Sequence, residues 1–451
     1  MFVLADLLEG LTGRRPGDAA QPIRRFVIDS REGGPGDVFV ALRGENTDGH
    51  FYISDAFGRG AVAAIVEQDV PLEALLLDLR HNVTQRAIKQ WTLPVIFRVD
   101  NSMIALQELA KWWRMRLKGL RVVGITGSVG KSSTKELIAT VLERDFVVLK
   151  SEGNQNNEIG LPLTLLQLEP KHQRAVLEMG MYASGEIARL AELAQPMVGV
   201  ITNVGPVHLE RLRSMEAIAE AKSELAQALP PEGVAILNFD DERVLAMRDK
   251  TPAQVLTYGL DPQADLWADE IVSEGLEGIH FTLHCRDEEF HVQVPLLGRH
   301  SVHTALRAVA VGLAESMSWD HILEGLQDRR AQLRLVAVPG PNGSTILDDS
   351  RRLIQRQPGL GVRGVEPAGR AQRAQDRRAG RHAGTGRVRR RGTSHGKPAR
   401  DRCLRSAGHS RRTGPRHRAG GVEQRHGAGS REDVRHQRRG DGLPQCDRAA
   451  G

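Results

Sequence analysis

The chain has 451 residues, of which 40% are hydrophobic and 26% charged, and a formal net charge of +6 at pH 7. This length suits about three domains. No segment reaches the roughly 18 consecutive apolar residues that a membrane-spanning helix needs, and the first residues lack a basic region followed by a long apolar run. We therefore expect a cytoplasmic protein that does not insert into membranes.

The net charge hides two regions of opposite sign. Residues 351–451 contain 26 Arg and 1 Lys against 8 Asp and Glu, a net of +19, which leaves −13 for residues 1–350. Residues 351–451 also contain no Phe, Trp, Tyr or Met, and their few aliphatic residues follow no period, so this segment cannot build a core. A solvated basic tail, a nucleic-acid-binding arm and the translation of a shifted reading frame are all open; arginine almost without lysine favours the shifted frame.

Residues 1–115 alternate short strands with helices, which predicts a small α/β domain. Polar, glycine-containing turns follow two of the strands, at 28–31 and 41–52. Ligands of α/β sheets bind at such turns, although plain connections are an equal alternative. The candidate ligand-binding residues in the two turns are Ser30, Arg31, Thr47, Asp48 and His50.

The segment 121–142 has the features of a phosphate-binding loop. Its β-branched start, its two glycines and its apolar end at helical spacing predict a strand, a loop and a helix. Backbone N–H groups at such a helix N-terminus bind phosphate, while Lys131 reaches the outer phosphates and the Ser132 hydroxyl holds Mg²⁺. Ile125 stands where the strict pattern has its first glycine, and the alternative is an ordinary glycine turn. The expected ATP-binding residues of the loop are Thr126, Gly127, Ser128, Val129, Gly130, Lys131, Ser132 and Ser133.

Further apolar strands follow at 146–149, 175–180, 198–205 and 234–238, and their continuous apolar character predicts a parallel sheet covered on both faces. Between the first two of these strands lies GNQNNEIGLPLTLL. Its asparagines Asn154, Asn156 and Asn157 suit the binding of amides, carboxylates or phosphate oxygens. Turn formation by asparagine is the alternative.

Three ionisable residues near the predicted loop are candidates for catalysis. Glu178 ends an apolar strand, where an acid costs free energy unless it is paired or binds a metal ion. His208 follows the strand 198–205 and could reach the same pocket, or could be structural. Lys222 lies on a predicted helix, where a solvated lysine is the plain alternative.

Beyond residue 261 the sequence predicts alternating strands within 278–297, a turn and helix over 298–315, and an apolar strand that starts at Thr345.

Taken together, these motifs resemble the Mur ligase family of peptidoglycan synthesis over residues 1–350. The resemblance rests on TGSVGKSSTKE, GNQNNEIGLPLTLL, LEMGMYASGEIA, ITNVGPVHLERLRS, AIAEAKSEL and LGRHSVHTALRA. The asparagine-rich stretch and Glu-Met-Gly indicate the branch that adds D-alanyl-D-alanine to UDP-N-acetylmuramoyl-tripeptide. The resemblance implies an ATP-dependent carboxylate-amine ligase of cell wall biogenesis, and with it of cell shape and division, that works through an acyl phosphate.

The resemblance also implies a domain organisation. Residues 1–115 would bind the UDP substrate, 116–330 would form a central ATPase-like domain with a parallel sheet, and 331–350 would begin a C-terminal ligase domain. A Rossmann-like fold is usual for that last domain, and here the basic tail, 351–451, stands in its place.

Residue roles follow from the same resemblance. Lys131 would bind the β and γ phosphates, with Arg334 and His300 also near the nucleotide. Magnesium ligands would be Ser132, Glu178, His208 and, once carbamylated, Lys222. Ser30, Arg31, Thr47, Asp48, His50, Asn154, Asn156 and Asn157 would face the UDP-linked substrate.

Three departures from the family pattern temper these expectations. Asp349-Ser350 runs into Arg351-Arg352 where the family continues as Tyr-Asn-Ala. Ser301 and Thr304 replace asparagines that are common near the adenine, and the segment 211–213 replaces a usual Gly-Phe-Gly. We expect a monomer that binds ATP and the UDP-sugar substrate but ligates weakly or not at all.

Two rival readings remain. One is a related ligase, either the Mur ligase that adds the third residue or a folylpolyglutamate-type enzyme. The other is a P-loop protein that binds nucleic acid through its basic tail, which the acidic residues 1–350 oppose.

Overall fold

The computed structural model describes residues 2–16, 19–81, 92–207 and 209–328, together with the backbone of β15 (Val336–Pro339) and β16 (Thr345–Asp348). These two strands pair antiparallel, and β16 confirms the strand predicted at Thr345. His208, Arg334 and the basic tail 351–451 lie outside the described residues, so the expectations for them stay predictions.

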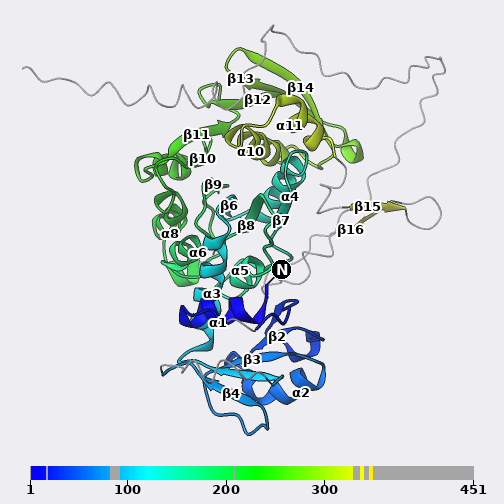
Figure 1. The fold of residues 1–451 in the computed structure, drawn as a ribbon. Helices are drawn as coiled ribbons and strands as arrows, with labels where there is room; N and C mark the ends of the chain where they lie inside the picture. Colours follow the sequence, from blue (N-terminus) through cyan, green and yellow to red (C-terminus); the bar gives the residue numbers. More distant parts are fainter. Residues whose placement is uncertain are drawn as a thin grey trace, which may run out of the picture. The chain divides into compact units, whose positions relative to one another are not determined.

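The N-terminal part is a five-stranded parallel sheet with helices on both faces (Figure 1). Helix α2 (Ile53–Gly58) shares one apolar cluster with one face of the sheet. Helices α1 (Leu4–Thr12) and α3 (Ser102–Arg116) belong to the cluster on the other face. This arrangement confirms the small α/β domain. The sheet order is β1 (Phe26–Val27), β2 (Val38–Val40), β3 (Ala63–Val66), β5 (Val95–Arg98) and β4 (Leu75–Asp78).

The central part is built on a nine-stranded sheet that begins with the predicted strand β6 (Arg121–Thr126). The run from β7 to β12 along the sheet is parallel, as the apolar strands predict, and β13 and β14 extend it as an antiparallel hairpin. In sheet order the strands are β14 (Glu288–Val294), β13 (Ile279–Cys285), β12 (Leu266–Ser273), β11 (Gln254–Gly259), β10 (Val234–Asn238), β9 (Val198–Ile201), β6, β8 (Arg174–Glu178) and β7 (Val148–Lys150).

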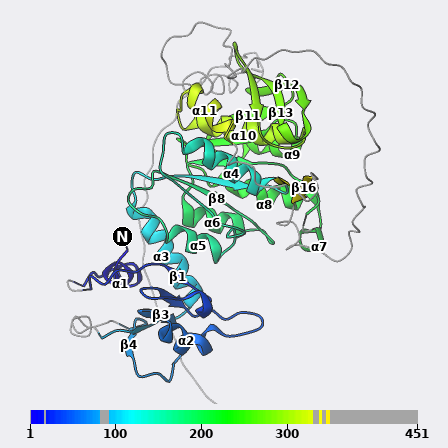
Figure 2. The ribbon, with the colours of Figure 1, turned by 90° about the vertical axis from the view of Figure 1, so that its right-hand side faces the viewer.

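Helices cover both faces of this sheet because alternate residues of its buried strands point to opposite sides. In β6, Val122 belongs to the apolar cluster of one face and Val123 to that of the other. Figure 2 shows the resulting layers. The Val122 side carries α3, α5 (Gly160–Leu165), α6 (Glu186–Ala194) and α8 (Met215–Gln227); the Val123 side carries α4 (Lys131–Leu142), α10 (Ser301–Ala314) and α11 (Trp319–Leu326).

Strand order sets the position of the site. After β6 the chain adds β7 and β8 on one side, and it then crosses to add β9 on the other. The carboxyl ends of β6, β8 and β9 therefore meet at a topological switch point, which is where open α/β sheets bind ligands.

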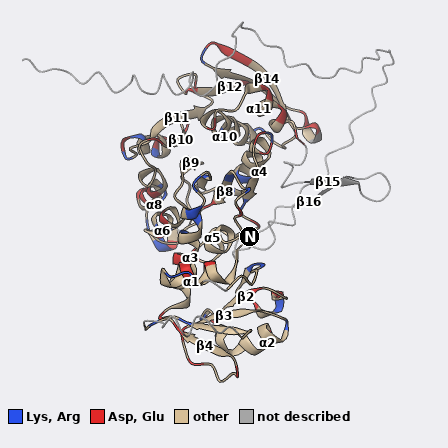
Figure 3. Ribbon diagram, in the orientation of Figure 1, with Lys and Arg blue, Asp and Glu red and all other residues tan. Residues whose placement is uncertain are grey.

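Acidic and basic residues are interspersed along the described helices, while acids gather on the hairpin end of the sheet (Figure 3). These acids include Asp269, Glu270, Glu288 and Glu289. Within the described residues, no helix is both long and apolar enough to span a membrane.

Candidate active site

The loop between β6 and α4 has a backbone that favours glycine at two positions. Gly127 has φ +146° and Gly130 φ +85°, a region that residues with a Cβ rarely adopt. A Cβ on Gly127 would also lie 1.8 Å from Thr202 Oγ1. Both glycines of the predicted phosphate loop are therefore required by its geometry.

The end of β9 holds this loop in place. Ser128 N donates to Asn203 O (3.0 Å) and Val129 N to Asn203 Oδ1 (2.9 Å), while Thr202 Oγ1 donates to Val129 O (2.7 Å). Thr202 and Asn203 belong to the ITNVG segment, but their contact with the loop depends on β9 lying beside β6. Sequence reasoning did not single them out.

Ser132, Glu178 and Asn156 meet at the carboxyl ends of the strands. Ser132 Oγ donates to Glu178 Oε2 and Asn156 Nδ2 to Glu178 Oε1, each at 2.9 Å. Glu178 is 3% exposed, so the two hydrogen bonds offset the cost of burying its carboxylate. The structure thus brings together three predicted site residues from separate segments.

Two lysines lie close to one another near the phosphate loop. Lys131 Nζ donates to the loop carbonyl of Gly127 at 3.0 Å. Lys222 is 2% exposed, and burial, with repulsion from the Lys131 ammonium, lowers its pKa to about 7. The solvated-lysine alternative is therefore wrong for Lys222. Near neutral pH much of this side chain is an uncharged amine, the form that reacts with electrophiles.

The asparagine-rich segment folds into a turn that packs against Glu178. Asn156 also donates to Asn154 Oδ1 (2.9 Å), whereas Asn157 Oδ1 accepts from the backbone of Gly160 (2.9 Å) at the start of α5. Asn154 and Asn156 thus line the cluster, while Asn157 has the turn-forming contact that was its alternative reading.

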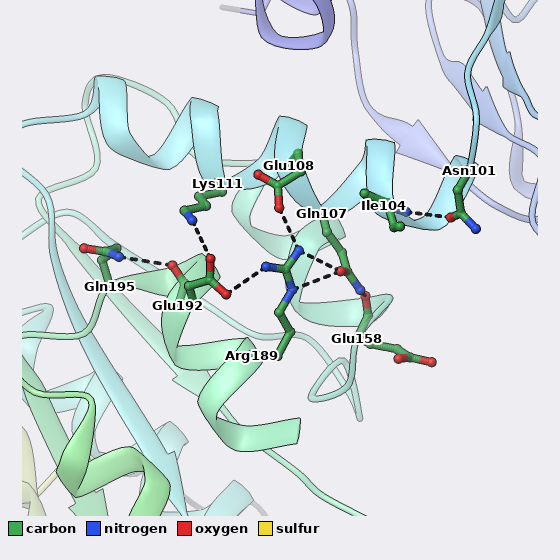
Figure 4. A network of polar contacts seen from close by, with 9 residues as sticks. All are labelled: Asn101, Ile104, Gln107, Glu108, Lys111, Glu158, Arg189, Glu192 and Gln195. Atoms are coloured by element: carbon green, nitrogen blue, oxygen red, sulfur yellow. Dashed lines mark hydrogen bonds and ion pairs between the residues drawn. The ribbon is translucent and has the colours of Figure 1, made fainter. Parts of the chain in front are cut away.

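A polar network between α3 and α6 supports this turn (Figure 4). Gln107 Nε2 donates to Glu158 O at 3.1 Å, and Gln107 Oε1 accepts from Arg189 Nε and Nη2 at 3.2 and 3.1 Å. Arg189 also pairs with Glu108 and Glu192. The network fixes the backbone two residues beyond Asn156.

Lys135 is a second residue that supports the Glu178 cluster, and sequence reasoning missed it. It is 1% exposed, and its Nζ donates to Ser151 O (2.5 Å) and pairs with Glu136 (3.1 Å). Ser151 Oγ in turn accepts from Glu178 N at 3.3 Å. A lysine one turn beyond the loop on an otherwise amphipathic helix was the available signal.

In the N-terminal domain, the side chains of Asp48 and His50 hydrogen-bond to each other. Asp48 caps the short helix η2 (Gly49–Tyr52) and its Oδ1 lies 2.5 Å from His50 Nδ1. His50 Nε2 accepts from Glu67 N at 3.0 Å, so Nδ1 carries the proton that Asp48 accepts. Burial acts to raise the pKa of Asp48, but the His50 hydrogen bonds outweigh it and lower that pKa. This pair uses its hydrogen-bonding capacity within the fold.

The other predicted residues of this domain differ in exposure. Arg31 and Thr47 are exposed, with Thr47 Oγ1 3.0 Å from Tyr52 Oη, whereas Ser30 is buried in η1 (Ser30–Glu32). Hydrogen bonds from Arg31 lower the pKa of Asp29 to about 2. These residues follow β1 and β2, so they share the carboxyl edge of the sheet, as predicted.

Helix α10 borders the loop from the other side. His300 is exposed just before it, and Arg307, two turns further on, reaches α4 and donates to Thr134 Oγ1. Arg307 was not predicted as a site residue. A single arginine within the otherwise apolar run 305–314 was the available signal.

The donor set fits Mg²⁺ in chemistry, since hydroxyl, carboxylate and amide oxygens are ligands this ion accepts. Within the described residues, which lack His208, no cluster of three His, Cys, Asp or Glu side chains forms a metal site. Ser132 and Glu178 are the described residues best placed to hold such an ion.

Comparison with known proteins identifies the family. Residues 125–312 match the Mur ligase middle domain, and residues 22–119 match the Mur ligase family, catalytic domain. The UDP-N-acetylmuramoyl-tripeptide--D-alanyl-D-alanine ligase of Bacillus subtilis is 35% identical over 348 residues, covering 77% of this chain and 71% of that protein. The Synechocystis enzyme of the same name is 37% identical over 309 residues, covering 67% of this chain and 61% of its own length.

Solved structures agree. A crystal structure of MurF from Acinetobacter baumannii superposes with a TM-score of 0.65 at 30% identity, covering 76% of this chain and 72% of that one. The structure of MurF ligase from Thermotoga maritima in complex with ADP gives 0.58 at 30% identity, covering 76% and 71%. The chain thus spans about 61% to 72% of the lengths of these relatives. With the resemblance confirmed in sequence and in fold, the chain belongs to the Mur ligase family.

Proposed function

We propose that this chain is the ATP-dependent amide ligase that joins D-alanyl-D-alanine to UDP-N-acetylmuramoyl-tripeptide. The observation that carries the proposal is the cluster of Ser132, Glu178 and Asn156 beside Lys131 and the buried Lys222, at the switch point of the central sheet. The relatives of the same name and the ADP complex of a similar structure support both the substrates and the nucleotide.

ATP would bind with its phosphates on the loop 126–133. The N–H groups at the start of α4 would donate to the phosphates, and the helix dipole would favour their negative charge. Lys131 would leave its contact with Gly127 O to meet the outer phosphates. Mg²⁺ held by Ser132 and Glu178 would neutralise charge on the γ-phosphate, which is the chemistry a metal ion supplies in phosphoryl transfer.

The remaining residues orient the acceptor. The substrate carboxylate attacks the γ-phosphorus, the bond between that phosphorus and ADP breaks, and an acyl phosphate forms. The amine of D-alanyl-D-alanine then attacks the acyl carbon, loses a proton and displaces phosphate. Asn156 donates to Asn154 and to Glu178, and so holds the Asn154 amide where its N–H groups can bind the substrate carboxylate. Lys222 as a neutral amine can add to the carbon of CO₂ and lose a proton, which would give a carbamate anion that can serve as a metal ligand.

The N-terminal domain would hold the UDP portion at the carboxyl edge of its sheet, with Arg31 and Thr47 exposed for contact. Asp48 and His50 would shape the turn that presents them. His208, Arg334 and His300 remain proposed contacts of magnesium and nucleotide. We place this activity in the cytoplasm.

Ligation by this chain is expected to be weak, because the residues after Ser350 lack the family pattern and an acyl phosphate hydrolyses unless water is excluded. ATP binding and slow phosphate release are expected to persist. Normal ligation would contradict this part of the proposal.

The test is phosphate release by the full chain with MgATP and UDP-N-acetylmuramoyl-tripeptide, with and without D-alanyl-D-alanine, alongside Lys131→Met. We expect release that requires the tripeptide substrate and Lys131. Stimulation by UDP-N-acetylmuramoyl-dipeptide with a diamino acid instead would favour the ligase that adds the third residue, and folate-dependent release would favour a folylpolyglutamate-type enzyme. Phosphate release that none of these substrates stimulates would overturn the proposal.

A further inference from the structure

Arg307 is a buried cation beside the phosphate loop that has only neutral partners. The residue is 5% exposed in α10, yet no ion pair joins it to a carboxylate in the described part of the chain. Its Nε donates to Tyr258 Oη at 2.9 Å and its Nη1 donates to Thr134 Oγ1. Burial raises the pKa of Tyr258 to about 12, so this phenol is uncharged near neutral pH.

The guanidinium lies against the loop itself. Its Nη1 is 3.3 Å from where a Cβ on Gly130 would stand, and Gly130 is the residue from which α4 starts. Thr134 is in the first turn of that helix. Tyr258 Oη also donates to Thr202 O (3.1 Å), and the Thr202 side chain holds Val129 O. Arg307 is thereby linked to the start of α4 directly through Thr134, and to Val129 indirectly through Tyr258 and Thr202.

The neutral surroundings leave most of the cation's capacity unused. A guanidinium carries five N–H donors, and hydrogen bonds within the described residues engage two of its nitrogens. A buried charge without a counter-charge is costly, and a planar guanidinium matches the oxygens of a phosphate group. The anion that belongs next to this loop is the nucleotide.

We propose that Arg307 is a further nucleotide-binding residue, which supplies a positive charge from α10 to the phosphates of ATP in addition to that of Lys131. This inference rests on the proposed function, because it takes the loop to be an ATP site. The contact would also couple nucleotide binding to the packing of α10 on α4.

Two contrasting arginines make the proposal testable. Arg114, on helix α3, is also buried, at 7% exposure. Its guanidinium donates to backbone carbonyls, among them Ala194 O at 3.0 Å. Arg114→Met therefore removes a buried arginine of similar exposure away from the loop. Arg307→Met removes the positive charge at the loop, whereas Arg307→Lys keeps it.

The experiment measures the affinity of the full-length variants for adenosine, ADP and ATP with Mg²⁺ by calorimetry, together with thermal unfolding of each protein. A charge-assisted contact to phosphate predicts that Arg307→Met weakens ATP binding about tenfold to a hundredfold while adenosine binding changes less than about twofold. Arg307→Lys should recover part of the ATP affinity. Arg114→Met should lower the melting temperature and leave the ratio of ATP to adenosine affinity unchanged.

Equal loss of adenosine and ATP affinity, or unchanged ATP affinity, in Arg307→Met would overturn the proposal and make Arg307 a structural link. If Arg307→Met does not fold, the same comparison is made with Arg307→Lys and Arg307→Gln, and no difference between them in ATP affinity counts against it. Failure of the unchanged chain to bind ATP would instead refute the proposed function, which separates the two outcomes.

Discussion

The phosphate loop and the N-terminal turns are both polar, glycine-containing connections at the carboxyl edge of a parallel sheet, yet their side chains are used differently. At the loop, Ser132, Asn156 and Glu178 converge from three segments. In the turn 41–52, Asp48 and His50 satisfy one another and the backbone of Glu67. The first arrangement gathers polar groups where a ligand can bind, whereas in the second the polar groups stabilise a turn.

The comparison separates two kinds of polar residue that look alike in a sequence. One kind converges with side chains from other segments on a shared carboxylate, as Asn156 does on Glu178, whereas the other accepts hydrogen bonds from backbone N–H groups within a few residues, as in a cap or a turn. Asn156 and Asn157 are neighbours and fall on opposite sides of this line.

The largest effect is expected at Gly127. Gly127→Ala places a methyl group 1.8 Å from Thr202 Oγ1 at φ +146°, so the loop must shift. We expect a loss of more than about 2 kcal/mol in unfolding free energy and loss of ATP binding. Urea unfolding and calorimetry check both.

The matched control is Gly58→Ala in helix α2, where a Cβ meets nothing within 4 Å. This variant should be neutral or stabilised by about 0.5–1 kcal/mol. Equal effects of the two alanines would mean that the loop glycine has no special role.

A pH-dependent effect is expected from Lys222. Its pKa is about 7 in the folded protein, against about 10.4 in an unfolded chain, so the unfolded state binds more protons between these values. Unfolding free energy should therefore rise with pH from about 7 to 10 relative to Lys222→Met, by an amount on the order of a few kcal/mol. Unfolding in CO₂-free buffer without Mg²⁺ measures this. Parallel pH profiles for the two proteins would show that Lys222 titrates normally.

A smaller effect is expected at Asp48. Asp48→Ala leaves the buried Nδ1–H of His50 without its acceptor and should cost about 1–3 kcal/mol of unfolding free energy. Nucleotide affinity should not change, because the pair serves its own turn. A lost ATP affinity with unchanged stability would reverse the contrast between the two regions.

The smallest effect is expected at Arg31, which is 82% exposed in its side chain and pairs with Asp29. Arg31→Ala should leave the unfolding free energy nearly unchanged, as is usual for surface ion pairs. If Arg31 contacts the UDP-linked substrate, the same variant should weaken binding of that substrate in a titration. Unchanged binding would assign Arg31 to the turn alone.

The sequence by itself determined the local elements and the family. The β-branched run, the two glycines and the apolar spacing after Lys131 predicted β6, the loop and α4, because backbone sterics and periodicity act over a few residues. It also indicated Glu178, since a single acid ending a buried strand is conspicuous. It did not reveal β4, β11 or β12, which exist as strands through their pairing with neighbours in the sheets.

Only the tertiary structure decided which polar residues act together. Asn156 meets Glu178, Lys222 is buried beside Lys131, and Arg307 reaches the start of α4. All three follow from the strand order around β6, which brings together residues as far as 173 positions apart. Burial and electrostatic environment are properties of that arrangement. The same lysine would be an ordinary surface cation on an isolated helix.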